Sequence, residues 1–199
     1  MYASAFVLGF HGCDESVGER ILSGEEHLTA SENVYDWLGS GIYFWENSQK
    51  RALQWANHIK NHPSVFKTQI TKPFVVGAII DLGRCLDLTE ASSIERLKGS
   101  FADLKKMMDR AGTKMPKNEP GGKGDMDLVK RNLDCMVINF LHSLRKKRRL
   151  SPFESVRGAF WEGSPVYAGA RIMERTHIQI CVRSSKNIKG YFRPLPEAD

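Results

Sequence analysis

The chain has 199 residues, of which 41% are hydrophobic and 26% charged, and this balance is that of an ordinary globular protein and excludes a disordered one. Its formal charge of +6 and pI near 9.2 favour a polyanionic partner, although a solvated surface rich in lysine and arginine gives the same balance. No apolar run reaches the roughly 20 residues that cross a bilayer, and residues 1–4 lack the basic start of a signal peptide. We therefore expect a cytoplasmic protein that does not associate with membranes.

The cysteines are scattered along the chain and form no CxxC pair, so the sequence contains no zinc-binding motif. In a reducing compartment such isolated cysteines are expected to remain free thiols. The four residues are Cys13, Cys85, Cys135 and Cys181. We expect no metal site.

The first predicted element is a buried strand over residues 5–10, which ends at His11-Gly12. An imidazole beside a residue without Cβ lets a flat ligand approach the backbone closely. Ser16 and Glu19 have the spacing of a capping box, which predicts that a helix begins there and ends near Gly24.

A second pair of elements is predicted around Gly39-Ser-Gly41. The two glycines indicate a tight turn, and the apolar residues 42–45 that follow predict a short buried strand. Asn47 is a typical N-cap for an amphipathic helix over residues 48–59. The buried face of that helix would comprise Ala52, Trp55, Ala56 and Ile59.

The remaining elements follow from hydrophobic periodicity. Apolar residues recur every three or four positions in two segments and predict helices over residues 87–108 and 127–144. The glycine-, proline- and lysine-rich segment 112–125 between them predicts a mobile loop. Strands are predicted over residues 74–82, 153–160, 178–182 and 188–192. Since neither a repeat nor a domain boundary is evident, residues 1–199 are expected to form a single domain.

Five consecutive cations follow the second of these helices. Cations are favourable at the negative end of a helix dipole, which would make them a solvated helix terminus. A run of this kind is also typical of nucleic-acid contact. Both interpretations stay open for Arg145, Lys146, Lys147, Arg148 and Arg149.

The motifs His11-Gly-Cys13 and Gly39-Ser-Gly-Ile-Tyr-Phe44, in this order and followed by Lys50, resemble the ADP-ribosyltransferases. The resemblance is to the diphtheria-toxin and poly(ADP-ribose) polymerase branch with its His-Tyr-Glu signature, and it covers about the first sixty residues and the end of the chain. It implies an α+β fold, a split β-sandwich of two mainly antiparallel sheets around an NAD cleft. Helices would lie outside, with a mostly helical insertion over about residues 84–150.

The resemblance also implies roles in binding NAD, the substrate of these enzymes. His11 would bond a ribose hydroxyl on the adenosine side, and Gly12 would pair its N–H and C=O with the nicotinamide carboxamide. Tyr43 would stack on the nicotinamide ring, with Gly41 in the turn before it.

Two positions depart from the family. Arg51 stands where many relatives have a small hydroxyl residue that touches the carboxamide. Trp55 lies one residue beyond Gln54, the position of a second stacking ring, and one residue along a helix turns a side chain by about 100°. Trp55 is therefore either a wall of the nicotinamide pocket or a core residue.

The third catalytic position falls on the last but one strand. Gln179 aligns with the catalytic glutamate, and His177, on the same face of the strand, aligns with a residue that selects the acceptor. Glutamine carries no charge at the developing cation. Either Glu162 or Glu174 supplies the carboxylate, or the enzyme is slow, or its acceptor is already a good nucleophile. Arg157 and Glu162 are further candidates for acceptor selection.

The sequence leaves the acceptor open. A free-standing basic transferase resembles bacterial toxins of toxin–antitoxin or phage-defence systems, some of which modify DNA or RNA, and a neutralising antitoxin protein would then be a partner. The cation run favours nucleic acid over protein. Four alternatives remain. The first two are a protein-directed mono-ADP-ribosyltransferase and an inactive NAD or ADP-ribose binding module. The third is an RNA 2′-phosphotransferase-like enzyme, in which His177 would act with Arg157, Arg175 or Arg183. In the fourth, the helical middle of the chain is chiefly a partner-binding surface.

Overall fold

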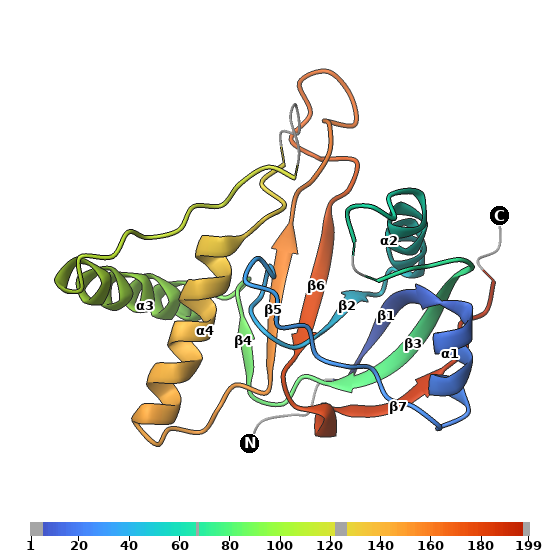
Figure 1. The fold of residues 1–199 in the computed structure, drawn as a ribbon, viewed down its shortest axis with the longest axis horizontal. Coiled ribbons are helices and arrows are strands. Elements are labelled where there is room, and N and C mark those ends of the chain that lie inside the picture. Colours follow the sequence, from blue (N-terminus) through green and yellow to red (C-terminus); the bar gives the residue numbers. More distant parts are fainter. Residues whose placement is uncertain (1–5, 67, 122–126, 197–199) are drawn as a thin grey trace.

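The computed structural model describes residues 6–66, 68–121 and 127–196, and its centre is a seven-stranded mixed sheet (Figure 1). The strand order is β4-β5-β6-β2-β1-β3-β7; β4 and β5 are parallel and all other neighbours antiparallel. The strands are β1 (Phe6–Asp14), β2 (Ile42–Glu46), β3 (Pro73–Asp81), β4 (Cys85–Asp87), β5 (Ser155–Phe160), β6 (His177–Val182) and β7 (Ile188–Phe192). The helices are α1 (Glu15–Leu22), α2 (Gln49–Asn61), α3 (Ala91–Arg110) and α4 (Asn132–Lys147), with a 3-10 turn η1 (Ser185–Asn187).

The expected α+β class is confirmed, but two separate sheets are not, because hydrogen bonding runs through all seven strands. The sheet is nevertheless joined unevenly. β1 pairs with β2 at two positions only, Gly9↔Glu46 and Phe10↔Trp45, whereas it pairs with β3 at nine. The halves β4-β5-β6-β2 and β1-β3-β7 therefore meet at a narrow contact, which we call the β1–β2 joint.

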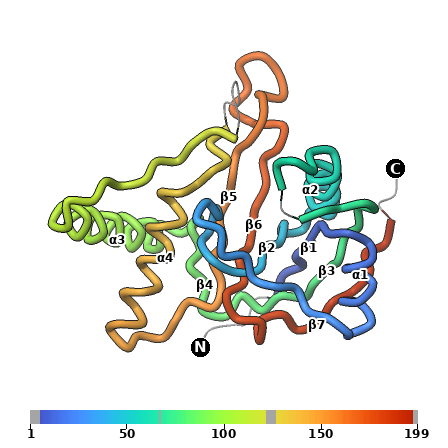
Figure 2. Tube along the Cα trace, viewed as in Figure 1, coloured from blue at the N-terminus to red at the C-terminus, as the bar shows by residue number. Residues whose placement is uncertain are grey.

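Each face of the sheet carries its own core. On one face, residues of β5 and β6 pack against α4 and against the segment between α1 and β2, which runs across the sheet toward β5 and back (Figure 2). This cluster comprises Leu38, Leu86, Ile138, Phe153, Val156, Phe160 and Cys181. The cluster on the other face comprises Ile42, Phe44, Ala78, Ile80, Ile180 and Val182. Helices α1 and α2 pack on the β1-β3 half.

β1 is longer than predicted. It continues through His11-Gly12 to Asp14, because β3 pairs with it over this whole length. The N-cap of α1 is consequently Asp14 and not Ser16, whose N–H donates to Asp14 Oδ1 at 3.1 Å. Asp14 Oδ2 accepts from the N–H groups of Thr71 and Lys72, and these bonds, that of Lys72 foremost, hold the pKa of the Asp14 carboxyl well below its usual range. Gly24 follows the end of α1 with a left-handed φ of +80°, as predicted.

α2 also differs from its prediction. Its N-cap is Ser48 and not Asn47, which adopts a left-handed φ of +52°. Ala52, Ala56 and Ile59 form the buried face, but Trp55 is 39% exposed. The Trp55 ring stacks on His58 with centroids 5.6 Å apart and packs against Trp45 and Phe66 instead of entering the core.

The insertion begins with the short strand β4, which extends the sheet, and contains two helices that start four to five residues later than predicted. Of the loop predicted over residues 112–125, residues 122–125 lie outside the described residues. All four cysteines are free thiols, as predicted. Among the described residues, every helix is too short or too polar to cross a membrane.

Close packing of α2 on β1 requires glycine at position 12. A Cβ there would lie 2.2 Å from the carbonyl oxygen of Ala52 in the backbone of α2. Gly12→Ala should therefore lower the free energy of unfolding by about 1–3 kcal/mol, the cost of overpacking a core. Gly99→Ala is the control: Gly99 lies in α3 with open space around it, so alanine should stabilise by about 0.5–1 kcal/mol. Urea denaturation measures both, and destabilisation of similar size in the two variants would contradict this role of Gly12.

Candidate functional site

The two sequence motifs meet at the β1–β2 joint. His11 Nδ1 lies 2.8 Å from the backbone oxygen of Tyr43. Since a carbonyl can only accept, Nδ1 carries the proton, and Nε2 of the neutral ring is left as an acceptor. Burial lowers the pKa of His11, which favours this neutral form. The imidazole thus donates to the Tyr43 carbonyl, which a backbone N–H would occupy in a continuous strand pair. Its Nε2 remains available to a hydrogen-bond donor.

The peptide groups of Gly12 point into the same joint. Asn47 N–H donates to Leu8 C=O at 2.9 Å, on the β2 side of β1. Alternate residues of an antiparallel strand direct both peptide groups to the same neighbour, so Phe10 and Gly12 direct theirs to this side as well. Phe10 pairs there with Trp45, but the pairing has ended at Gly12. The joint therefore presents an N–H and a C=O side by side, next to the His11–Tyr43 bond.

The Tyr43 hydroxyl is fully occupied within the protein. It donates to Gly39 C=O at 2.6 Å and accepts from Leu38 N–H at 2.8 Å, so it fixes the turn before β2. Burial raises the pKa of Tyr43 well above its usual range, which keeps the phenol neutral. The partly buried ring packs beside the core cluster of the β5-β6 face. His11 packs against Phe44, which points to the opposite face, so the imidazole and the phenol ring lie on opposite sides of β2.

The other residues predicted to bind NAD have structural partners. Gly41 exchanges both of its backbone hydrogen bonds with Ser31, at 2.8 and 3.0 Å, and a Cβ at this position would lie 2.5 Å from Cys181 Sγ. Close packing on β6 is thus sufficient to explain the glycine. Trp55 contacts Trp45, which neighbours Phe44 in β2, and therefore lies on the face of the sheet opposite to the His11 ring.

Gln179 lies opposite Trp45 of β2 and Gly158 of β5, two residues along β6 from His177. These pairings place its side chain on the same face as the Tyr43 ring, because Tyr43 and Trp45 are alternate residues of β2. Gln179 is partly exposed. Gln179 therefore shares a face with the Tyr43 ring, and its role as the third catalytic residue stays a prediction.

A charged cluster that the sequence did not predict lies at the same end of β6. Arg51 Nη2 of α2 is 3.3 Å from Glu162 Oε2, and His177 Nδ1 is 3.6 Å from the same oxygen. Glu162 is buried, and burial raises its pKa, an effect that the cations of Arg51 and Arg175 partly offset. The pair connects α2 with the segment that follows β5. Arg51, which stands where many of the resembled enzymes have a small hydroxyl residue, thus pairs with Glu162, 111 positions away.

His177 is an interior residue in this structure. Its side chain is 1% exposed, between the rings of Trp37 and Phe160 at 6.1 and 5.8 Å. Nδ1 donates to Arg175 C=O at 2.7 Å, while Nε2 has no partner among the described residues. Burial, assisted by the Arg51 cation, lowers the pKa of His177 to about 4. His177 therefore does not face a macromolecular acceptor here.

Arg157 lies on the other face of the sheet. It forms two hydrogen bonds with Glu46, at 2.6 and 3.0 Å, and one with Asp87 at 3.0 Å. Its strand partner is Ile180, whereas Gln179 pairs with the next residue, Gly158. Arg157 thus ties β2, β4 and β5 together, away from the face that carries Gln179 and His177.

The segment between β5 and β6 continues both strands as a hairpin. Backbone bonds join Arg175 to Glu162, Glu174 to Ser164, and Val166 to Ile172. Large apolar side chains are exposed along this extension, a feature that the turn-rich sequence did not reveal. They are Trp161, Val166, Tyr167 and Ile172.

The cation run divides into two parts. Arg145 donates to Ser151 C=O at 2.9 Å and lies 4.2 Å above the Phe153 ring, so it closes the end of α4. The next four residues are exposed. They are Lys146, Lys147, Arg148 and Arg149.

Comparison with known proteins supplies no function. An uncharacterized protein of Methanocaldococcus jannaschii, MJ0359, is 26% identical over an alignment 197 residues long that takes in 90% of this chain and 83% of that protein. No protein-family model and no solved structure matches the chain. The function must therefore be inferred from the geometry of the site.

The buried His177 should make stability depend on pH. Because its pKa is about 4 in the folded protein and 6.5 in the unfolded chain, the unfolded state binds more protons between these values. Stability should fall as the pH drops from 6.5 to 4, by about 3 kcal/mol from this residue. His177→Asn, which retains a donor for Arg175 C=O, should flatten this part of the profile, leaving the contributions of His11, His58 and His142, whose pKa values burial also lowers.

Urea denaturation across this pH range measures the effect. His27→Asn, at an exposed position, is the control and should leave the profile as in the wild type. An unchanged slope in His177→Asn would show that His177 can be protonated within the folded protein.

Proposed function

We propose that the protein is an NAD-dependent ADP-ribosyltransferase that transfers ADP-ribose to a macromolecule, with nucleic acid as the favoured acceptor. The observation that carries the proposal is the β1–β2 joint, where strand pairing ends and His11 Nδ1 bonds the Tyr43 carbonyl. The two halves of the sheet on either side of it would then correspond to the two sheets of a split β-sandwich.

The groups at the joint suit the nicotinamide end of NAD. A primary carboxamide offers one acceptor and one donor pair, which complement the N–H and C=O that Gly12 directs into the joint. His11 Nε2, an acceptor in the neutral ring, suits a ribose hydroxyl. The Tyr43 ring provides a flat apolar surface on the other side of β2 from the imidazole, so NAD would have to extend across the joint to contact both. Because these groups are held by the sheet, they are ordered before the substrate binds.

The reaction requires positioning and charge stabilisation. The bond between ribose C1′ and the nicotinamide nitrogen breaks, and both electrons leave with nicotinamide, which becomes neutral. The remaining ribose cation is oxocarbenium-like, and a nucleophilic oxygen or nitrogen of the acceptor attacks C1′ and loses its proton. A carboxylate near the cation lowers the barrier because its charge acts where water is excluded.

Glu162 is our candidate for that carboxylate. Gln179 can accept a hydrogen bond from a ribose hydroxyl but cannot balance a cation. Glu162 is buried at the same end of β6 and reaches Arg51 of α2, whose neighbour Ala52 touches Gly12. Arg51 Nε has no partner among the described residues. A diphosphate could therefore draw Arg51 away and release the Glu162 carboxylate.

The acceptor would approach along the β5–β6 extension. Trp161 and Tyr167 are exposed there, and aromatic side chains of this kind stack with unpaired bases. The exposed cations Lys146–Arg149 and the net charge of +6 favour a polyanion. A nucleic-acid-modifying transferase would fit a toxin of a toxin–antitoxin or phage-defence system, with an antitoxin as partner. A protein acceptor is the alternative.

A second candidate function is an inactive module that binds NAD or ADP-ribose. The observation that favours it is Gln179, an amide at the position of the catalytic carboxylate. This module would bind NAD at the joint without releasing nicotinamide. The phosphotransferase alternative has less support, because two of the arginines it needs for a phosphate pocket form hydrogen bonds elsewhere. Arg157 bonds Glu46, and Arg183 donates to Ser40 C=O at 2.6 Å.

The proposal is tested with adenine-labelled NAD and, separately, RNA, single-stranded DNA, duplex DNA and lysate protein. We expect label on a nucleic acid together with release of nicotinamide. Glu162→Gln should lower nicotinamide release by about 100-fold or more, the size of losing one preorganised electrostatic group. Gln179→Glu should retain or raise it, because a second carboxylate then faces the cation.

Glu174→Gln, on the same hairpin but exposed, is the matched control and should react as the wild type. If only protein becomes labelled, the acceptor is a protein and the proposed nucleic-acid acceptor is wrong. Bound NAD without nicotinamide release would favour the binding module, and failure to bind NAD at all would refute both functions.

A further inference from the structure

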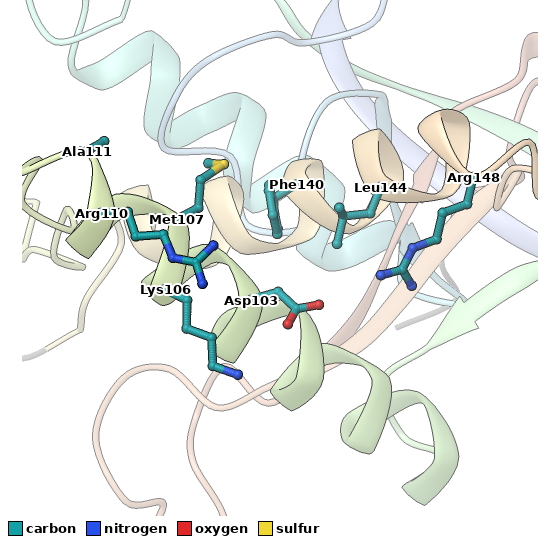
Figure 3. Close-up of a pocket in the computed structure, with 8 residues that line it drawn as sticks. All are labelled: Asp103, Lys106, Met107, Arg110, Ala111, Phe140, Leu144 and Arg148. Carbon is teal, nitrogen blue, oxygen red and sulfur yellow. The ribbon is translucent and has the colours of Figure 1, made fainter.

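A groove on the helical insertion takes no part in the proposed cleavage of NAD, although Arg148 at its rim is one of the exposed cations named above. α3 and α4 pack against each other and leave a groove of about 650 Å³ between them (Figure 3). It is separated from the β1–β2 joint by β5, β6 and β2 in the sheet order, since the insertion joins the sheet at β4. Its lining consists of Asp103, Lys106, Met107, Arg110, Ala111, Phe140, Leu144 and Arg148.

The groove is apolar along its length and basic at its rim. Met107 is 49% exposed, and Phe140 and Leu144 of α4 are partly buried beside it. Lys106 and Arg110 stand one turn apart on α3, and Arg148 extends from the end of α4 (Figure 3). Among the described residues none of these three cations has an ion-pair partner, and Asp103 is the one acidic residue of the lining.

The surroundings strengthen this positive charge. Residues 135–153 contain five cations and no acidic residue. Arg145 is held at the end of α4 by Ser151 and Phe153, but the four cations after it are exposed. The groove therefore combines an apolar floor with an excess of cations that lack partners.

We propose that this groove binds an acidic amphipathic helix of a partner protein. Aliphatic side chains of that helix would cover Met107, Phe140 and Leu144, and its carboxylates would pair with Lys106, Arg110 and Arg148. This is the helix-in-groove mode of recognition, in which apolar residues at spacings of three and four provide anchors. The flexible Met107 side chain can adapt to such anchors.

The apolar floor is what favours a protein over a nucleic acid here. Covering exposed aliphatic surface stabilises a complex, and a phosphate backbone has no aliphatic surface to contribute. A nucleic acid could use the rim cations but would leave Met107 and Leu144 uncovered. The proposal does not depend on NAD chemistry.

The test uses fluorescence anisotropy with a fluorescein-labelled 15-residue peptide. Its leucines are spaced three and four apart, with glutamates on both flanks. Its two comparison probes are a scrambled peptide of the same composition and a single-stranded RNA 15-mer. We expect the amphipathic peptide to bind at least tenfold more tightly than the scrambled one and to resist competition by the RNA. Equal affinity for the two peptides, or RNA that binds more tightly and displaces the peptide, would overturn the proposal.

A pair of double variants locates the binding surface. Lys106→Glu with Arg110→Glu should weaken peptide binding at least tenfold. Lys98→Glu with Lys105→Glu changes the charge of the same helix equally, at exposed positions outside the groove lining, and should change affinity less than threefold. Equal losses of peptide affinity in the two double variants would show that only long-range charge acts, and would contradict binding in the groove.

Crosslinking keeps the test independent of the variants. The same peptide with photo-leucine at its anchor positions should crosslink the wild-type protein at residues 103–111 or 140–148. Crosslinks at other positions would overturn the assignment even if the variants failed to fold.

Discussion

The early end of strand pairing between β1 and β2 is the constraint on which the rest of the site depends. A buried peptide group without a partner costs about 1–3 kcal/mol, and pairing stops after Phe10 and Trp45. His11 compensates at one position by donating to the Tyr43 carbonyl. The peptide groups of Gly12 remain directed into the joint, where a ligand that both donates and accepts could replace the missing strand partner.

The Arg51–Glu162 pair is the second contact that shapes this region. It joins α2, which packs on β1 through Gly12, to the hairpin that extends β5 and β6. The two sides of the joint are therefore linked by charge as well as by the sheet. Partly buried ion pairs add little net stability, and in the proposed site this pair would respond to the anionic diphosphate of NAD.

Local patterns predicted the strands well and the contacts between distant segments poorly. β3, β6 and β7 lie within a residue of their predicted ends because continuous apolar runs define them. The N-cap of α1 is Asp14 and not the predicted Ser16. The sequence around α1 could not reveal this, because Asp14 is also held by Thr71 and Lys72, which lie 57 and 58 positions away. Arg51 with Glu162, and the groove between α3 and α4, likewise depend on tertiary packing. The motifs did place His11 beside Tyr43, but the roles of both residues in binding NAD stay a prediction.

The most direct test of the account follows backbone amide signals of ¹⁵N-labelled protein during titration with NAD. The account predicts that the amide of Gly12 shifts progressively and saturably, together with that of Tyr43, while amides of the α3–α4 groove such as Met107 stay in place. That result would locate the ligand at the β1–β2 joint whatever the acceptor is. Saturable shifts that leave Gly12 and Tyr43 unchanged, or no shifts at all, would contradict the claim that the joint is the nicotinamide site.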